Sequence, residues 1–259
     1  MIYIITALDA EARALIDFYG LKRDMSLPYT LYSGEDILLL ITGVGEKNAM
    51  MAVSALLGWK TPTSNDCLIN IGICAAEYEI GEALLIHQII TQGKTYYPDI
   101  LYPHTLRESS LLCVNTPQSS ITNHPVDMES GGVFCAAERF FKLHQMAFLK
   151  IVSDHFEPQS LSKELVISLI HSHQRTLESI IQSLSQLCSK PPLFSEHERE
   201  AIEGVKGYFT KSQGDILEDA FCFFRLKHPA KPLPLEIAEP TSKHHRSQLH
   251  EHLIHTLVS

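Results

Sequence analysis

Two acidic side chains stand just beyond apolar segments of the chain, where they could donate or accept protons. Glu11 follows the apolar residues 2–6, and Asp154 follows the apolar residues 148–152. Carboxyl groups on either side of a substrate are common agents of general acid and general base catalysis. Each also has an ordinary structural explanation. Asp154 could cap the start of a helix, and Glu11 could be a solvated carboxylate in the first turn of one.

Glycine-containing turns follow two further apolar segments. Thr42-Gly43-Val44-Gly45 follows residues 36–41, and the turn 70–75, with Gly72, continues the segment 67–71. Tight turning between a strand and a helix is sufficient to explain these glycines. Asn48 stands where a dinucleotide-binding GxGxxG motif requires its third glycine, and the spacing does not fit a Walker loop.

The apolar segments alternate with helix-forming segments, which predicts the class of fold. Continuously apolar strands separated by helices indicate an α/β protein whose sheet is covered on both faces, with ligands bound beyond the carboxyl ends of the strands. Strands are expected at residues 2–6, 36–41, 67–71, 83–91, 111–114 and 148–152. Helices are expected at residues 9–19, 48–57 and 131–142, and a single long helix at 161–188.

Lys190-Pro191-Pro192 marks the expected domain boundary, because proline ends a helix. We expect an α/β domain over residues 1–190 and a C-terminal helical extension over residues 191–259. The extension has capping-box spacing at Ser195 and Glu198, an apolar helical segment at 214–226, a Pro-rich link at 229–240 and a final short helix.

The C-terminal extension carries a histidine-rich end and an aromatic cluster. The histidines at 244, 245, 250, 252 and 255 fit no standard metal-site spacing, so we expect a solvated amphipathic tail and no bound metal. The apolar side chains at 221, 223, 224 and 226 are expected to dock on the main domain or on a partner.

Composition excludes several classes of function. The 259 residues carry a formal net charge of −9, which offers no basic surface for nucleic acid, and 45% are hydrophobic, as in an ordinary globular protein. Acidic residues follow the apolar start directly, so no secretory signal is predicted, and no apolar run reaches the length of a membrane span. The six scattered cysteines are expected to be reduced, and the chain is expected to be cytoplasmic.

Five short motifs together resemble those of methylthioadenosine/S-adenosylhomocysteine nucleosidases, in the nucleoside phosphorylase superfamily. Residues 7–11 resemble the "GAMEEE" motif, 42–45 the "SGIG" turn, 70–75 the "NTGSAG" turn, 126–130 the "VEMEA" motif and 151–154 the "AISD" motif. Each is weak alone, but they occur in the family's order over about residues 1–190. The resemblance implies a three-layer sandwich with a central mixed, mostly parallel sheet.

The resemblance also implies roles for individual residues. Asp154 would protonate or hydrogen-bond N7 of a purine, which requires a carboxyl group that keeps its proton in a partly dry site, and Ser153 would orient it. Glu11 would hold and deprotonate a water molecule that attacks C1' from the other side of the sugar. Glu129 would accept hydrogen bonds from the ribose 2' and 3' hydroxyls, and Met128 would pack on the sugar face.

Departures from the family pattern bear on the substrate. Asn70 and Ile73 stand where related phosphorylases have arginine and serine, which favours water over phosphate as the nucleophile. The segment before the "VEMEA"-like motif is shortened to residues 115–125, so Thr116 and Pro117 become candidates to line the base pocket. Gly43 and Ile73 are further candidates for substrate contact.

The sequence therefore predicts a cofactor-free nucleosidase that acts as a homodimer and releases adenine from a 5'-modified adenosine: methylthioadenosine, S-adenosylhomocysteine or 5'-deoxyadenosine. A place in purine or methionine salvage would follow. Two alternatives stay open. One is a purine nucleoside phosphorylase, and the other is a nucleoside-binding module without turnover.

Overall fold

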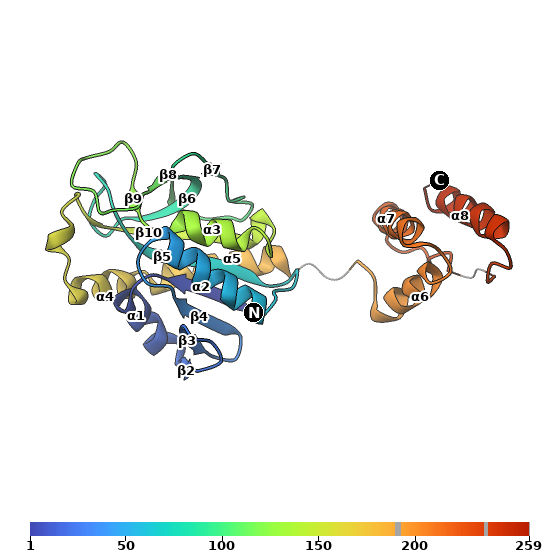
Figure 1. Ribbon diagram of the computed structural model, residues 1–259, viewed down its shortest axis with the longest axis horizontal. Coiled ribbons are helices and arrows are strands. Elements are labelled where there is room, and N and C mark those ends of the chain that lie inside the picture. Colours follow the sequence, from blue (N-terminus) through green and yellow to red (C-terminus); the bar gives the residue numbers. More distant parts are fainter. Residues whose placement is uncertain (190–192, 236–237, 259) are drawn as a thin grey trace. The chain divides into compact units, whose positions relative to one another are not determined.

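The computed structural model describes residues 1–189, 193–235 and 238–258, and it contains two compact units (Figure 1). Unit 1 is Met1–Lys190 and unit 2 is Pro191–Ser259. Within the described ranges, no helix is both long enough and apolar enough to cross a membrane.

Unit 1 is built on one ten-stranded mixed sheet in the order β10-β6-β8-β9-β5-β1-β4-β3-β2, with β7 paired to β6. The strands are β1 (Ile2–Thr6), β2 (Lys22–Asp24), β3 (Thr30–Ser33), β4 (Ile37–Ile41), β5 (Cys67–Ala75), β6 (Ala83–Ile90), β7 (Thr95–Tyr96), β8 (Arg107–Cys113), β9 (Val126–Asp127) and β10 (Met146–Asp154). Five of the pairings among described residues are parallel and five are antiparallel. The α/β class and the mixed sheet are confirmed, and the longest pairings, of β10 with β5 and of β6 with β8, are parallel.

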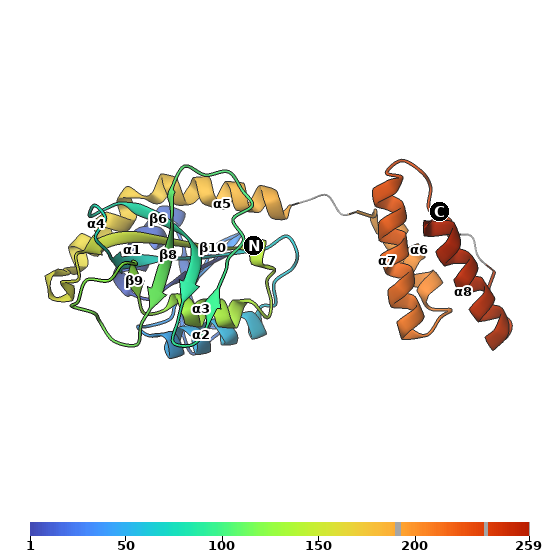
Figure 2. The ribbon, with the colours of Figure 1, turned by 90° about the horizontal axis from the view of Figure 1, so that it is seen from above.

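Helices cover both faces of the central strands. They are α1 (Asp9–Tyr19), α2 (Glu46–Trp59), α3 (Ser130–Ala137), α4 (Lys163–Ser172) and α5 (Gln174–Cys188). Figure 2 shows α2 and α3 on one side of the sheet and α5 on the other. Alternate residues of β1 face opposite cores, because Tyr3 and Ile5 pack in the core that includes α2 and α3, and Ile4 packs in the core that includes α1, α4 and α5. Burial on both faces explains why β1, β4 and β5 are continuously apolar.

The far half of the sheet closes on itself, which differs from the expected three-layer sandwich. Strand β10 pairs with β6 on one side and with β5 on the other, so β5, β9, β8, β6 and β10 form a ring. Strands β5 and β10 are nine residues long, and twist accumulates along a strand of that length. Each can therefore pair with neighbouring strands that run in different directions. The pairing shifts register between Val152 and Asp154, at the end of β10 that carries the candidate acid.

The expected single helix over residues 161–188 is two helices, α4 and α5. His173 separates them, with φ −103° and ψ 10°, and its Nε2 atom lies 2.7 Å from the carbonyl oxygen of Gly81. The apolar periodicity continues across the break because both helices pack in the same core. Periodicity alone therefore could not reveal the break.

Unit 2 contains α6 (Glu196–Lys206), α7 (Lys211–Lys227) and α8 (Lys243–Val258) around a small core of its own. The predicted capping box is present, because the Ser195 hydroxyl accepts from the Glu198 amide and Glu198 accepts from the Ser195 amide. Phe221 is fully buried in this core, while Phe223 and Leu226 are exposed. The histidine-rich segment forms the expected final helix, α8, which buries its side chains at 253 and 257 and leaves His244, His252 and His255 exposed.

Candidate active site

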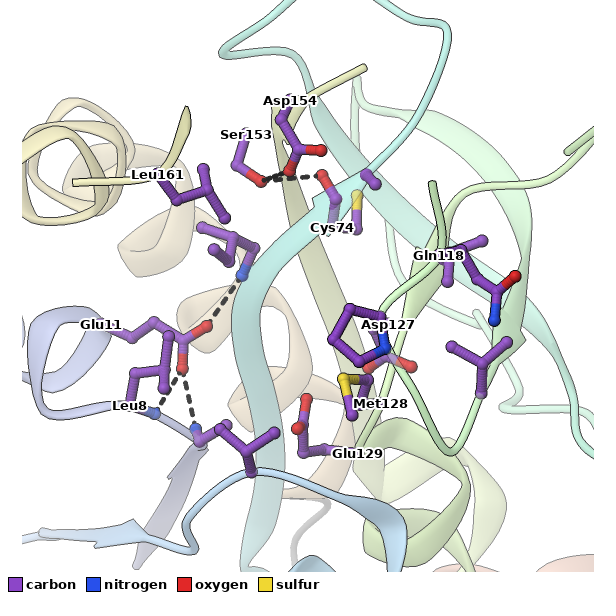
Figure 3. Close-up of a pocket in the computed structure, with 17 residues that line it drawn as sticks. Leu8, Glu11, Cys74, Gln118, Asp127, Met128, Glu129, Ser153, Asp154 and Leu161 are labelled. Atoms are coloured by element: carbon purple, nitrogen blue, oxygen red, sulfur yellow. Dashed lines mark hydrogen bonds between the residues drawn. The ribbon is translucent and has the colours of Figure 1, made fainter. Parts of the chain in front are cut away.

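A pocket of about 200 Å³ opens where the carboxyl ends of β1, β5 and β10 meet the start of α3 (Figure 3). Four acidic residues line it, and we call it the carboxylate pocket. They are Glu11, Asp127, Glu129 and Asp154. Apolar surface makes up most of the remaining wall, as is usual for small-molecule sites. The four acidic residues come from parts of the chain up to 143 positions apart, between Glu11 and Asp154.

Glu11 is held rigidly at one side of the pocket. It lies in the first turn of α1, and its side chain folds back, so that Oε2 accepts from the amides of Ala7 at 2.8 Å and Leu8 at 2.9 Å. Oε1 accepts from the amide of Ile73 in β5 at 3.0 Å. Only 3% of Glu11 is exposed, so it is not the solvated first-turn carboxylate that the sequence also allowed.

Burial raises the pKa of Glu11, whereas the nearby Lys150 ammonium and the three amides oppose that shift. Gly72 gives Glu11 its space, because a Cβ atom at position 72 would lie 2.7 Å from Oε1 of Glu11. The glycine in the turn 70–75 thus has a specific steric role beside the candidate base.

Lys150 is a buried cation beneath the carboxylate pocket, and no sequence motif pointed to it. It lies in β10, and its Nζ atom is 2.9 Å from Oδ2 of Asp127, with side-chain exposures of 2% and 1%. Burial opposes the charge on Lys150, but the carboxylates of Asp127, Glu129 and Glu11 more than compensate and raise its pKa. A lysine inside a nine-residue strand that is otherwise apolar or small was the sequence signal for this pair.

Glu129 stands at the N-cap position of α3, and its Oε1 accepts from the amide of Gly45 at 2.8 Å. Burial, followed by the negative charge of Asp127, raises the pKa of Glu129 to about 7. Met128 lies beside it and lines the pocket. The "VEMEA"-like motif and the "SGIG"-like turn therefore meet at one wall of the pocket.

Ser153 and Asp154 lie together at the opposite end of the view in Figure 3 from Leu8 and Glu129. The Ser153 hydroxyl is 2.8 Å from Oδ2 of Asp154 and 3.2 Å from the carbonyl oxygen of Cys74. Oδ1 of Asp154 accepts from the amide of residue 157 at 2.8 Å, so Asp154 also caps the turn that follows β10. Both roles considered from the sequence are compatible with this geometry.

The chain turns sharply after Asp154. Phe156 has φ 63°, the only positive φ at a non-glycine residue in the described part of the chain, and it is 2% exposed. A bulky residue adopts this conformation at a cost of about 1–3 kcal/mol, which surrounding structure must offset. The strained turn begins two residues after the candidate acid.

The other predicted contact residues divide into two groups. Ile73 and Pro117 line the carboxylate pocket, whereas Thr116 and Gly43 do not. The Thr116 side chain is exposed, and its carbonyl oxygen accepts from the side-chain amide of Gln118 at 3.1 Å. Gly43 lies in an adjoining hollow.

Gln118 and Leu161 line the carboxylate pocket although no motif in the sequence selects them. Both lie outside the five family-like motifs. Gln118 lies on the loop between β8 and β9, and Leu161 lies just before α4. Gln118 contributes a side-chain amide, which can donate and accept hydrogen bonds. The shortened segment 115–125 therefore reaches the pocket through Pro117 and Gln118.

Asn70 has a structural role in place of anion binding. Its Nδ2 donates to the carbonyl oxygen of Ile5 at 3.1 Å, and its Oδ1 lies 3.1 Å from the Ser130 hydroxyl oxygen. Among the residues that the structure describes, no lysine, arginine or histidine lines the carboxylate pocket, and no group of side chains fits a metal ion. The site can place carboxyl groups around a neutral or cationic ligand.

No protein-family model and no curated protein sequence matches this chain. Solved structures do match it. A 5'-methylthioadenosine/S-adenosylhomocysteine nucleosidase from S. pneumoniae, with a transition-state inhibitor, has a TM-score of 0.59 at 15% identity and covers 71% of this chain and 99% of its own. The corresponding nucleosidase from Colwellia psychrerythraea, in complex with adenine, has a TM-score of 0.57 at 15% identity, covering 70% and 95%.

Futalosine hydrolase from Helicobacter pylori has a TM-score of 0.56 at 12% identity and covers 70% of this chain and 97% of its own. At such identities the likeness concerns the fold. The resemblance predicted from the five motifs, to nucleosidases of the nucleoside phosphorylase superfamily, is confirmed at the level of the fold.

Proposed function

We propose that the chain hydrolyses the N-glycosidic bond of a 5'-modified adenosine and releases adenine. The observation that carries this proposal is the placement of Glu11 and Asp154 in one pocket. Glu129 and Met128 lie next to each other on the other side of that pocket from Glu11 (Figure 3). The fold shared with nucleosidases supports the reaction class. Methylthioadenosine, S-adenosylhomocysteine and 5'-deoxyadenosine are the candidate substrates.

Asp154 is the proposed acid. The Ser153 hydroxyl has one proton and lies near both the Cys74 carbonyl oxygen and Oδ2 of Asp154. When that proton is donated to Oδ2, Ser153 fixes the orientation of the carboxyl group, and the proton of Asp154 stays free for N7. As the bond between C1' and N9 breaks, N7 takes the proton of Asp154, and adenine leaves as a neutral base.

Glu11 is the proposed base. Its two oxygens are fixed by three amides, which costs no reorganisation during the reaction. The Lys150 ammonium opposes the effect of burial on the pKa of Glu11 and so favours its ionised form. The water oxygen bonds to C1' while Glu11 takes one proton from it.

Glu129 and Met128 are the proposed ribose clamp. Glu129 lies opposite Glu11 at the lower end of the pocket in Figure 3, where its carboxyl group can accept from the 2' and 3' hydroxyls. A sugar held there places C1' between the candidate base and the candidate acid. Ile73 and Pro117 then complete the walls.

Water, not phosphate, is the proposed nucleophile. Four carboxyl groups line the pocket, and its described lining holds no cationic side chain to receive a phosphate dianion. The Asn70 side chain is neutral and is held by contacts with Ile5 and Ser130. A phosphorylase would need a cation from elsewhere, and a binding module would not need both Glu11 and Asp154.

We also propose that unit 1 is the catalytic domain and that the protein acts in the cytoplasm as a homodimer, in purine or methionine salvage. Several apolar side chains of unit 1 are exposed, among them Met51 at 51% and Leu101 at 65%, and a dimer interface could cover side chains of this kind. Sedimentation of the full chain tests the dimer.

Release of free purine tests the activity. The panel contains methylthioadenosine, S-adenosylhomocysteine, 5'-deoxyadenosine, adenosine and inosine, with and without phosphate, for the natural chain, Asp154→Asn and Glu11→Gln. Phosphate-independent adenine release that both variants abolish supports hydrolysis. Release only with phosphate would establish a phosphorylase, and ligand binding without release would favour the binding module.

A further inference from the structure

A second hollow of about 420 Å³ adjoins the carboxylate pocket, and we call it the side hollow. Both cavities are lined by Ala7, Leu8 and Val44, so the carboxylate pocket continues past these residues into the side hollow. The side hollow lies where α1 starts, beyond the carboxyl end of β4 and beside the approach to β3. Mostly polar surface lines it, whereas the carboxylate pocket is mostly apolar.

In the proposed pose, the 5' end of the substrate is directed toward the wall that the two cavities share. Figure 3 places Asp154 at one end of the carboxylate pocket and Leu8 at the other. With the base at Asp154 and the ribose at Glu129, the 5' end of the nucleoside faces Leu8 and Val44. A long 5' substituent would pass these residues and enter the side hollow.

The charged residues that line the side hollow determine which chemical group at the end of such a substituent would bind favourably. Asp9 is the only charged residue of the side hollow's described lining, and its carboxylate has no partner within the described part of the chain. Thr42 already donates its hydroxyl proton to the carbonyl of Thr6 or of Gly43, while Tyr29 and Thr30 have no side-chain hydrogen bond among the described residues. The hollow therefore offers hydroxyl groups, which can donate or accept hydrogen bonds, and one negative charge, while its described lining has no cationic side chain.

We propose that the side hollow binds the end of an extended 5' substituent that carries an ammonium group, with Asp9 as its counter-ion. The inference rests on the proposed function, because it takes the 5' direction from the placement of base and ribose. It predicts discrimination by charge. Tails that end in an amine are favoured over neutral tails, and tails that end in a carboxylate are disfavoured.

Three adenosines of matched size test this proposal: those with 3-aminopropylthio, 3-hydroxypropylthio and 2-carboxyethylthio groups at the 5' position. Dissociation constants are measured by calorimetry in the Asp154→Asn chain, which separates binding from turnover. We expect the amine to bind up to about 5-fold more tightly than the alcohol, as for an exposed ion pair, and the carboxylate to bind most weakly.

Asp9→Asn, added to Asp154→Asn, should remove the preference for the amine and relieve the penalty on the carboxylate. Glu35→Gln removes one exposed acidic group outside both cavities and should leave the order unchanged. Thermal melting of each variant shows whether the substitution at the start of α1 perturbs folding.

Equal binding of the three tails, or an order that survives Asp9→Asn, would overturn the assignment of the side hollow. Adenine release from methylthioadenosine by the natural chain is measured in parallel. If that release occurs while the tails are not distinguished, only this inference fails. If no purine is released from any substrate, the proposed function fails, and the binding order still decides the charge preference.

Discussion

The ammonium group of Lys150 lies 2.9 Å from Oδ2 of Asp127, and this ion pair is buried beneath the carboxylate pocket. The same oxygen of Asp127 accepts from the Ser130 amide at 3.0 Å and from its hydroxyl at 2.5 Å. Oδ1 of Asp127 has no partner among the described atoms, although Asp127 lines the pocket. One oxygen of the carboxylate is therefore committed to the protein, and the other is buried without a hydrogen bond among the described atoms.

Lys150→Met should destabilise the protein by about 3–5 kcal/mol, because it leaves the buried Asp127 carboxylate without its cation. The double variant Lys150→Met/Asp127→Asn should recover much of the free energy of unfolding, since it removes both charges. Urea unfolding measures both effects, and Lys47→Met, at an exposed lysine of α2, serves as the control.

The double variant should not recover activity. Lys150 lowers the pKa of Glu11, so without it the candidate base takes up a proton at a higher pH. The acid limb of the pH profile of kcat/KM should move to higher pH. A stable double variant with an unmoved profile would show that Lys150 is structural and does not position the charge of Glu11.

Glu129 should make stability depend on pH in a defined window. Its pKa is raised from 4.5 to about 7, so between these values the native state binds more protons than the unfolded chain. Stability from this group is fully present below pH 4.5 and is lost as the pH rises through 7. The loss is at most about 3 kcal/mol.

The measurement is the free energy of unfolding of the natural chain minus that of Glu129→Gln, followed across the same window. This difference should fall as the pH rises, because glutamine does not titrate. Glu77→Gln, at an exposed glutamate of the same unit, should show no such trend. A flat difference for Glu129→Gln would contradict the shifted pKa.

Gly72→Ala should reduce activity more than stability. The new methyl group would lie 2.7 Å from Oε1 of Glu11, which three amides hold in place, so the candidate base must move. We expect kcat/KM to fall by about 100-fold, since displacement of a catalytic group by about 1 Å has effects of that size. Circular dichroism and thermal melting check the fold.

Gly58→Ala is the matched control for that substitution. Gly58 lies in α2, and a Cβ atom added there would have no other atom within 4 Å, so alanine should stabilise the helix by about 0.5–1 kcal/mol without loss of activity. Comparable loss of activity in both variants would show that the effect does not act through Glu11.

Gln118→Leu should weaken recognition of the base. A leucine of similar size removes the donor and acceptor that Gln118 contributes to the pocket, and one neutral hydrogen bond is worth about 0.5–1.5 kcal/mol. We expect KM for the adenosine substrate to rise up to about 10-fold, and kcat to change little. Thr116→Val, at the exposed neighbour outside the pocket lining, should leave both constants unchanged.

The sequence determined the class of the fold, because continuously apolar strands such as residues 2–6 and 67–71 need cover on both faces. It also selected Glu11, Met128, Glu129, Ser153 and Asp154, which the structure brings to one pocket. Local patterns carry this information, since each motif lies at the end of a strand or directly after it, and the carboxyl ends of neighbouring parallel strands meet at one edge of a sheet.

Only the tertiary structure decided how distant segments complete one another. Closure of β10 onto β5 turned part of the expected sandwich's sheet into a ring, and a break at His173 divided a helix whose apolar periodicity is continuous. The ion pair of Lys150 with Asp127 depends on contacts between residues far apart in the chain. The same is true of the pocket lining, which includes Gln118 and not Thr116. Burial and charge pairing are properties of the folded neighbourhood, and a lysine or a loop glutamine acquires them only when the strands and helices around it have packed.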